Sequence, residues 1–171
     1  MSTAEHKQSA PSQVRCKIIT VSDTRNKDTD KSGKLMMEML ENEGHLIIDY
    51  VIVKDEIEPI RLEVLKGSGN PEIDVILTNG GTGIAKRDVT IETVQKLFDK
   101  EITGFGELFR ILSYQEDIGS AALMSRAAAG VINNKAVFAT PGSSGAVKLA
   151  MKKLILPEIG HIVGELKKDL S

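Results

Sequence analysis

Stretches rich in β-branched residues alternate along this chain with stretches whose apolar side chains recur at helical spacing, and few folds accommodate that alternation. The first pattern predicts strands at residues 14–22, 45–53 and 73–78. The second predicts helices at residues 33–43 and 56–66, between those strands. A strand that follows a crossover helix enters the sheet in the same direction as the strand before it. The order therefore predicts an α/β protein with a parallel sheet and helices packed on its faces.

The second half of the chain has mostly helical patterns around one more strand. Apolar spacing predicts a strand at residues 135–139 and helices at residues 91–99, 106–113, 144–153 and 157–169. The chain has no internal repeat. Its 171 residues suit one domain, which is expected to span residues 14–171.

The first 13 residues differ in composition from the rest of the chain. They are polar, rich in Ser, Gln and Ala, and show no sustained apolar period. Such a segment buries too little apolar surface to offset the entropy lost on ordering. Residues 1–13 are therefore predicted to form a flexible tail.

Charge balance and cysteine content exclude several classes of protein. The 22 Lys and Arg residues against 24 Asp and Glu residues give a net charge of −2, which argues against a protein that mainly binds nucleic acid. No apolar run approaches the roughly 20 residues that span a bilayer, and no signal-peptide pattern opens the chain. Cys16 is the one cysteine, so an internal disulfide is excluded and a reducing compartment fits. We expect a cytoplasmic protein that binds neither nucleic acid nor membranes.

Polar or glycine-rich segments follow each predicted strand of the sheet. In open α/β sheets, ligands bind outside the carboxyl ends of the strands. The segments that follow the strands here are residues 22–24, 54–56, 79–83 and 140–144. They are expected to converge on one edge of the sheet and to carry the functional site.

The segment at residues 78–90 carries the strongest signal among them. Its three glycines free backbone N–H groups to face a bound anion. Its polar side chains add donors and a carboxylate that suits magnesium or a water: Thr82, Lys86, Arg87 and Asp88. The spacing matches neither the P-loop nor the dinucleotide-binding motif. Taken alone, the segment is better explained as a tight turn in which Asp88 or Thr90 caps the next helix, because such turns are common.

The other candidates each have a functional and a structural interpretation. Residues 141–145 place free amides and hydroxyls before a helix, as a phosphate site does, but Ser143 or Ser144 there also fits an ordinary helix N-cap. Asp55 is either a second carboxylate of the site or a helix N-cap. Glu107 either accepts hydrogen bonds from the amino groups of a heterocycle or favours the first turn of a helix.

Arg126 and the histidines are the remaining candidates for a functional role. Arg126, beside Ser125, is either a phosphate ligand or an ion-pair partner. The histidines, His6, His45 and His161, lie far apart in the sequence, so neither a zinc cluster nor a nucleophilic histidine relay is predicted.

Taken together, the motifs from about Val14 to about Pro157 resemble the MogA/MoaB family of molybdenum-cofactor biosynthesis, especially its MoaB branch. The resemblance rests on Val21-Ser22-Asp23, Ser32-Gly33, Gly80-Gly81-Thr82-Gly83, Arg87-Asp88-Val89-Thr90, Gly104-Phe105-Gly106-Glu107, Ser125-Arg126-Ala127 and Pro141-Gly142-Ser143. It implies a three-layer α/β/α molybdopterin-binding fold with a mostly parallel sheet, assembled as a trimer or a dimer of trimers. It also implies adenylylation of molybdopterin by MgATP, which gives adenylyl-molybdopterin and pyrophosphate.

The resemblance also assigns roles to residues of this chain. Asp55 and Asp88 fall on the family's two site aspartates, which are expected to be catalytic and to hold Mg²⁺. The substrate-binding residues would be Ser22, Asp23, Gly80, Gly81, Thr82, Gly83, Arg87, Glu107, Ser125, Arg126, Pro141, Gly142 and Ser143. Two alternatives stay open: a non-catalytic molybdopterin-binding or carrier protein, and a scaffold trimer whose glycine loops are only structural. A separate molybdate-insertion protein is a further possible partner.

Overall fold

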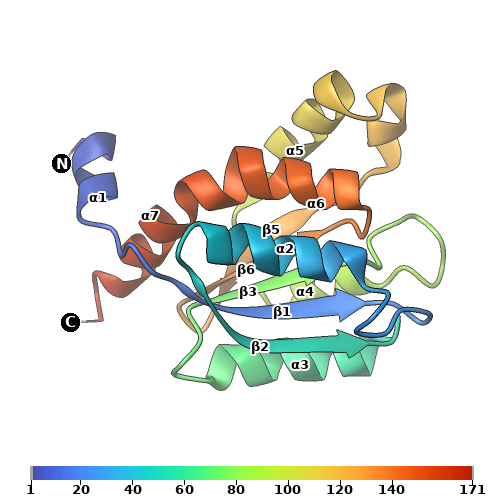
Figure 1. The fold of residues 1–171 in the computed structure, drawn as a ribbon, viewed down its shortest axis with the longest axis horizontal. Coiled ribbons are helices and arrows are strands. Elements are labelled where there is room, and N and C mark those ends of the chain that lie inside the picture. The colour runs from blue at the N-terminus through green and yellow to red at the C-terminus, as the bar shows by residue number, and fades with distance from the viewer. Residues whose placement is uncertain (1, 171) are drawn as a thin grey trace.

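The computed structural model describes residues 2–170 and confirms the alternation of strands and helices predicted from the sequence (Figure 1). Six strands form one sheet in the order β2-β1-β3-β6-β5-β4. Four of them run parallel: β1 (Arg15–Val21), β2 (Leu46–Val53), β3 (Val75–Asn79) and β6 (Lys135–Thr140). Two pair antiparallel at the far edge: β5 (Ala128–Ile132) and β4 (Lys100–Glu101).

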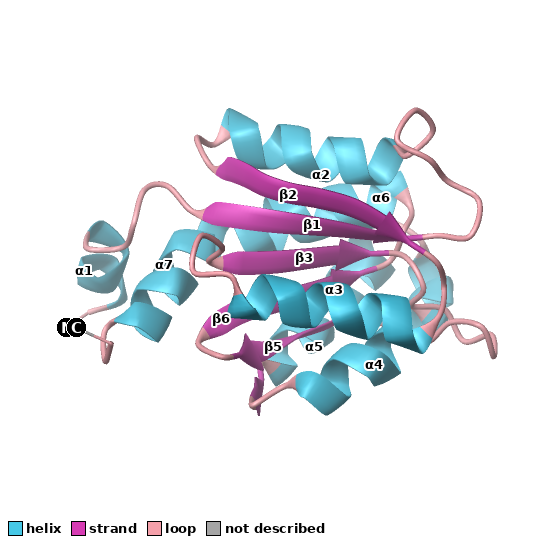
Figure 2. Cartoon of the chain, turned by 90° about the horizontal axis from the view of Figure 1, so that it is seen from below, coloured by secondary structure: helices cyan, strands magenta, loops and turns pink. Residues whose placement is uncertain are grey.

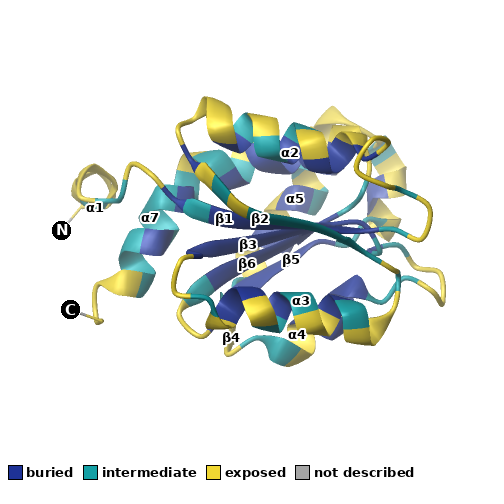
Figure 3. Ribbon diagram, turned by 60° about the horizontal axis from the view of Figure 1, so that its bottom comes forward, coloured by how far each residue is buried: buried dark blue, intermediate teal, exposed yellow. Residues whose placement is uncertain are grey.

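Helices cover both faces of the sheet, so the fold has the expected three layers (Figures 2 and 3). One face carries α2 (Lys31–Asn42), α5 (Thr103–Glu116), α6 (Ser144–Ala150) and α7 (Leu156–Lys167). The other carries α3 (Ile57–Gly69) and α4 (Thr90–Leu97). Each layer of helices closes its own apolar core against the sheet, with Phe109 and Phe138 in the first core and Ile19 and Ile76 in the second.

Cys16 lies in β1 with no exposed surface, and burial raises the pKa of its thiol to about 12. The thiol is therefore protonated at neutral pH and packs as a small apolar side chain.

No helix within residues 2–170 is both long and apolar enough to span a lipid bilayer.

The edge of the sheet at β4 and β5 was not predicted. β5 begins Ala-Ala-Gly, a sequence poor in the β-branched residues that mark strands. Its Gly130 lies under the ring of Phe98, where an added Cβ would come within 2.4 Å of a ring carbon. A tertiary contact therefore requires this residue type, and no local pattern reveals it.

The two helices predicted at the C-terminus form one continuous helical rod. A π-helical segment, η2 (Met151–Ile155), joins α6 to α7, and Pro157 lies in the first turn of α7. Proline lacks the N–H that an uninterrupted α-helix needs there. The altered hydrogen-bonding pattern of a π segment accommodates it without ending the helix.

A short helix, α1 (Thr3–Gln8), lies within the segment expected to be a flexible tail. The side chains of Ser2 and Glu5 form a capping box at its start. Farther on, the carbonyl of Pro11 lies 2.7 Å from where a Cβ would stand on Gly160, so the chain packs closely against α7. The mobility of this segment in solution stays a prediction.

An ion-pair cluster at the start of the parallel strands holds β1, β3 and α7 together. Asp74, just before β3, is buried and accepts hydrogen bonds from the backbone N–H and the guanidinium of Arg15. Lys167 of α7 lies 2.8 Å from the same carboxylate. Burial alone would raise the pKa of Asp74, but the hydrogen bonds from Arg15 and Lys167 outweigh it and hold the pKa at about 2.

We predict that Asp74→Asn lowers the free energy of unfolding by about 2 kcal/mol at pH 7. Folding lowers the pKa of this carboxyl from 3.8, so its contribution is present in full above pH 4 and is lost as the pH falls toward 2. Urea unfolding at pH 7 and at pH 3 measures both effects. Glu72→Gln, which removes an exposed partner of the same arginine, is the control and is expected to change stability little. Equal stability of Asp74→Asn and the unchanged chain would contradict the prediction.

Candidate functional site

A cavity of about 400 Å³ opens at the carboxyl ends of the central parallel strands. The register places Thr20, Asn79 and Thr140 level on β1, β3 and β6, so the segments that leave these strands meet. The strand order reverses at this point, because β2 lies on one side of β1 and β3 on the other. The cavity is lined by Val21, Ser22, Thr24, Arg25, Asp55, Gly80, Gly81, Thr82, Gly83, Asp88, Met124, Ser125, Arg126, Pro141 and Gly142.

The glycine loop after β3 needs its glycines for steric reasons. Gly80 has φ +99°, and an added Cβ would lie 2.2 Å from the carbonyl oxygen of Val21. Gly81 has φ +68°, and an added Cβ would lie 2.3 Å from Oγ1 of Thr90. Both conformations disfavour residues with a side chain. Thr90 closes the loop: its hydroxyl donates to the carbonyl of Gly80 and its N–H donates to that of Gly81.

Two carboxylates lie directly against this loop. An oxygen of Asp55 lies 2.9 Å from where a Cβ would stand on Gly81, and an oxygen of Asp88 lies 2.6 Å from the corresponding point on Gly83. Asp88 also accepts a hydrogen bond from the N–H of Ala85, within its own turn. Burial raises the pKa of Asp55, and the negative charges of Asp23 and Asp88 raise it further. The loop therefore holds two carboxylates on one side of the cavity.

Asp23 and Arg87 form an ion pair beside the cavity and are not among the residues that line it. The carboxylate of Asp23 accepts the N–H of Asp55, and this hydrogen bond, with Arg87, lowers the pKa of Asp23. Arg87 lines a neighbouring shallow depression that Asp55 shares. The pair thus links the segments after β1, β2 and β3 and holds Asp55 in position.

Arg126 holds the opposite side of the glycine loop. Its guanidinium donates to the carbonyls of Thr82 at 3.0 Å and of Gly83 at 2.7 Å, and it forms an ion pair with Glu92 of α4. In this structure Arg126 is therefore an ion-pair partner, of Glu92, which is one of the two roles considered for it from the sequence. The N–H of Gly80 donates to the carbonyl of Thr140, so an anion at the loop would have to bind the N–H groups of residues 81–83.

Besides Asp23 and Arg87, two more predicted site residues lie outside the cavity lining. Ser143 caps α6, where its hydroxyl accepts the N–H of Ala146 at 3.2 Å, while its neighbours Pro141 and Gly142 line the cavity. Glu107 lies exposed on α5. Their contacts with substrate stay predictions.

Arg25 is a cavity residue that the sequence did not single out. Its guanidinium donates to the hydroxyl of Ser32 and to the carbonyl of Gly142, and so joins the loop after β1 to the loop after β6. Ser32 in turn donates to Asn79, whose amide donates to Thr20. Only the fold shows that Arg25 is the side chain of this polar loop that turns toward the cavity.

Fold and cavity together define an α/β protein whose ligand site is built from backbone amides, carboxylates and arginines at a strand-order switch. The sequence profile described as "Probable molybdopterin binding domain" matches residues 17–161. Molybdenum cofactor biosynthesis protein B of Bacillus subtilis (strain 168) is 64% identical over 169 residues, which cover 99% of each chain. The chain belongs to the MogA/MoaB family of molybdenum-cofactor biosynthesis proteins, on the MoaB branch.

Solved structures agree with this assignment. The crystal structure of a molybdenum cofactor biosynthesis protein B, 63% identical, superposes with a TM-score of 0.90 and covers 92% of this chain and 98% of its own. The tungsten cofactor synthesizing protein MoaB from Pyrococcus furiosus, 39% identical, has a TM-score of 0.79 over 93% of this chain and 100% of its own. The three-layer molybdopterin-binding fold expected from the resemblance is thereby confirmed.

We predict that Gly81→Ala destabilises the chain by about 1–3 kcal/mol, because the new methyl group meets Thr90 and the backbone conformation disfavours a side chain. Gly104→Ala is the matched control: it lies in α5, and an added Cβ meets nothing within 4 Å. The control is expected to gain up to about 1 kcal/mol, since alanine favours helices. Thermal unfolding followed by circular dichroism measures both. Equal effects of the two substitutions would contradict a steric requirement at Gly81.

Asp55→Asn tests the electrostatics of the same loop. Folding raises the pKa of the Asp55 carboxyl. The protonated carboxyl therefore stabilises the native state at a pH below the ordinary pKa of aspartate, and this stabilisation is lost as the pH rises through the raised pKa. Asparagine has no charge to bury. We expect Asp55→Asn, without added metal, to unfold at or above the melting temperature of the unchanged chain at pH 7, with the difference vanishing toward pH 3. A clear loss of stability at pH 7 would show that the carboxylate is held by attractive contacts instead.

Proposed function

We propose that this protein adenylylates molybdopterin with MgATP as a step of molybdenum-cofactor biosynthesis. The observation that carries the proposal is the pair of carboxylates, Asp55 and Asp88, set against a glycine loop in the cavity at the strand-order switch. Membership of the family supports the pathway. The cavity volume of about 400 Å³ is in the range of small-molecule sites.

The proposed reaction transfers one adenylyl group. An oxygen of the terminal phosphate of molybdopterin attacks the α-phosphorus of ATP, a new P–O bond forms, and the bond between the α-phosphorus and the α–β bridging oxygen breaks. Pyrophosphate leaves with the electron pair. The attacking phosphate is already an anion near neutral pH, so the site needs no general base. Positioning and charge neutralisation would supply the catalysis.

Residues of the cavity suit the binding of two phosphorylated substrates. Arg126 and Thr90 hold the loop carbonyls, and the backbone N–H groups of residues 81–83 would bind phosphate oxygens. Ser22 and Ser125 add hydroxyl donors, and Arg25 adds a guanidinium at the junction of two loops. Together these groups would orient the attacking and leaving oxygens on opposite sides of the α-phosphorus.

The acidic side of the cavity fits a divalent cation. Burial raises the pKa of Asp55, and the negative charges of Asp23 and Asp88 add to that effect, which a bound cation would relieve. Mg²⁺ typically takes one or two carboxylates and completes its shell with phosphates and water. Asp55 and Asp88 would hold it, and when bound it would neutralise the phosphates of ATP.

We further propose that the chain forms a homo-oligomer, a trimer or a dimer of trimers. Apolar side chains that a monomer would leave in water gather on α5 and on the 3₁₀ segment after it, η1 (Gly119–Met124): Leu108, Ile111, Tyr114 and Leu123. Burial of such a patch in an interface is favourable. A molybdate-insertion protein that receives the product is a further proposed partner.

We predict that the purified protein releases pyrophosphate from MgATP only when molybdopterin is present. Asp88→Asn is expected to abolish this release, with a loss of at least about 100-fold, and to leave molybdopterin binding largely intact. A coupled pyrophosphate assay measures turnover, and equilibrium titration measures binding. Asp28→Asn, an exposed aspartate of the loop after β1, is the matched control and should retain full turnover. Turnover by Asp88→Asn near that of the unchanged protein would refute the role of Asp88.

Two other outcomes separate the competing functions. Saturable molybdopterin binding without pyrophosphate release would identify a carrier protein. Neither binding nor release would leave the glycine loops with a structural role. A ligand at about 100 times its Kd should raise the stability of the fold by about 2.7 kcal/mol, so thermal unfolding with molybdopterin distinguishes these cases independently of the assay.

The oligomer proposal predicts a mass of three or six chains in sedimentation experiments at micromolar concentration. Leu123→Glu places a charge on the most exposed side chain of the apolar patch and is expected to shift the protein toward monomers. Leu170→Glu, at an exposed leucine near the other end of the molecule, is the control. A monomeric unchanged protein would overturn the proposal.

A further inference from the structure

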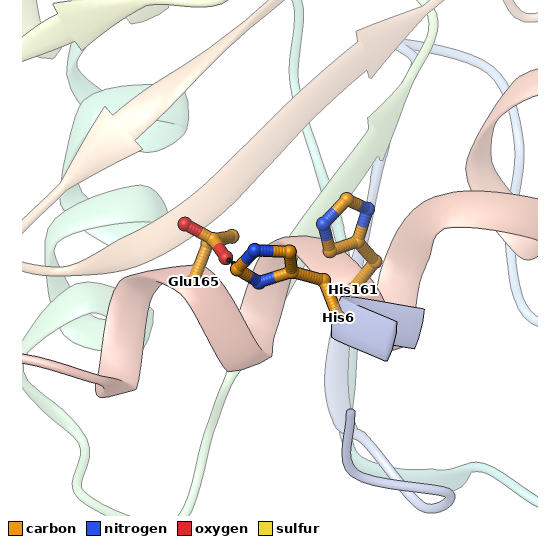
Figure 4. A group of neighbouring side chains, drawn as sticks. All are labelled: His6, His161 and Glu165. Carbon is orange, nitrogen blue, oxygen red and sulfur yellow. Dashed lines mark ion pairs between the residues drawn. The ribbon is translucent and has the colours of Figure 1, made fainter. Parts of the chain in front are cut away.

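Two histidines that are 155 positions apart in the sequence face each other across the contact between α1 and α7. Figure 4 shows the imidazoles of His6, from α1, and His161, from α7, together with the carboxylate of Glu165. One ligand atom from each of the three lies within 4.8 Å of the others. The sequence alone predicted no zinc cluster from these histidines. The packing of the N-terminal segment against the last helix brings them together.

The ligand chemistry and the separations fit a small divalent cation. In tetrahedral zinc sites the nitrogen and oxygen ligands stand about 2.0–2.1 Å from the metal, so neighbouring ligand atoms are about 3.3 Å apart. Nδ1 of His6 lies 3.0 Å from Oε1 of Glu165, close to that spacing. His161 and Glu165 lie four residues apart on α7, which places both on one helix face. The ligand nitrogen of His161 is the third ligand. It lies within 4.8 Å of the other two ligand atoms, and rotation of these partly exposed side chains would bring all three to one metal ion.

Neighbouring charged groups leave the ligand atoms available. Glu158 lies 3.0 Å from Nδ1 of His161, which leaves Nε2 of that ring as the ligand nitrogen. Carboxylates commonly hold the second ring nitrogen of a metal-bound histidine in this way. Lys168 contacts Oε2 of Glu165, so Oε1 is the oxygen that faces His6. Lys7 forms an ion pair with Glu158 through that carboxylate's other oxygen.

We propose that His6, His161 and Glu165 form a site for Zn²⁺ or a similar first-row divalent cation, with a fourth position open to water. Two imidazoles and one carboxylate are a typical zinc ligand set with one open position. The bound ion ties α1 to α7 and orders an N-terminal segment that has little apolar surface of its own. The site lies apart from the cavity, whose lining residues it does not share. The proposal is therefore independent of the catalytic one.

Metal binding is tested on untagged full-length protein that has been treated with a chelator and then dialysed against Zn²⁺. The expected result is one zinc per chain by elemental analysis. The double variant His6→Ala/His161→Ala should lose it, and Glu165→Gln should bind at least about tenfold more weakly in chelator competition. Lys7→Met is the matched control, because it removes a neighbouring ion pair of α1 and keeps all three ligands. It should still bind one zinc.

A second measurement reports the ordering of the N-terminal segment. Zn²⁺ should slow cleavage of the chain between residues 9 and 13 by a protease in the unchanged protein and in Lys7→Met, and should have no effect on the double variant. Substitution with Co²⁺ should give the visible absorption of a four-coordinate site. Equal zinc content in the double variant and the unchanged protein, or zinc bound without protection of the segment, would overturn the proposal. Protection that is independent of metal in all variants would show that ion pairs alone hold α1.

Discussion

The cavity depends on the close approach of Gly80 to the carbonyl of Val21. No side chain separates them, so the loop after β3 lies directly against the end of β1. An added Cβ on Gly142, in the loop after β6, would lie 3.1 Å from the Cα of Gly80. Three strand ends thus meet within a few ångströms. This meeting of loops positions the cavity residues that follow β1, β3 and β6, so the side chains there depend on the backbone conformation.

Charge around the cavity is arranged so that the protein's own ion pairs fix the loops. Arg126 binds two loop carbonyls, and Arg87 pairs with Asp23, which in turn holds the N–H of Asp55. The burial of Asp55 between such partners raises its pKa. Carboxylates whose pKa is shifted by burial and by neighbouring charges are common at functional sites.

The sequence predicted the features that depend on local patterns and missed those that depend on contacts between residues far apart in the chain. The strands and helices around β1, β2 and β3 were predicted because each has a local apolar period. β5 was missed because Gly130 is required by its contact with the ring of Phe98, which no pattern of neighbouring residues reveals. Likewise, the structure places Asp55, Asp88 and the glycines in the cavity lining, and all of them were candidates because of the segments in which they lie. Arg25 was not, because nothing in a polar loop marks which side chain turns inward.

The sequence by itself determined the α/β architecture and the edge of the sheet that carries the candidate site. These follow from periodicity and from where strands end. Only the tertiary structure decided that Arg126 holds the loop, that Asp23 pairs with Arg87, and that His6 meets His161. The physical reason is that apolar periodicity marks which face of an element is buried, whereas which polar side chains meet across the chain depends on how the elements pack.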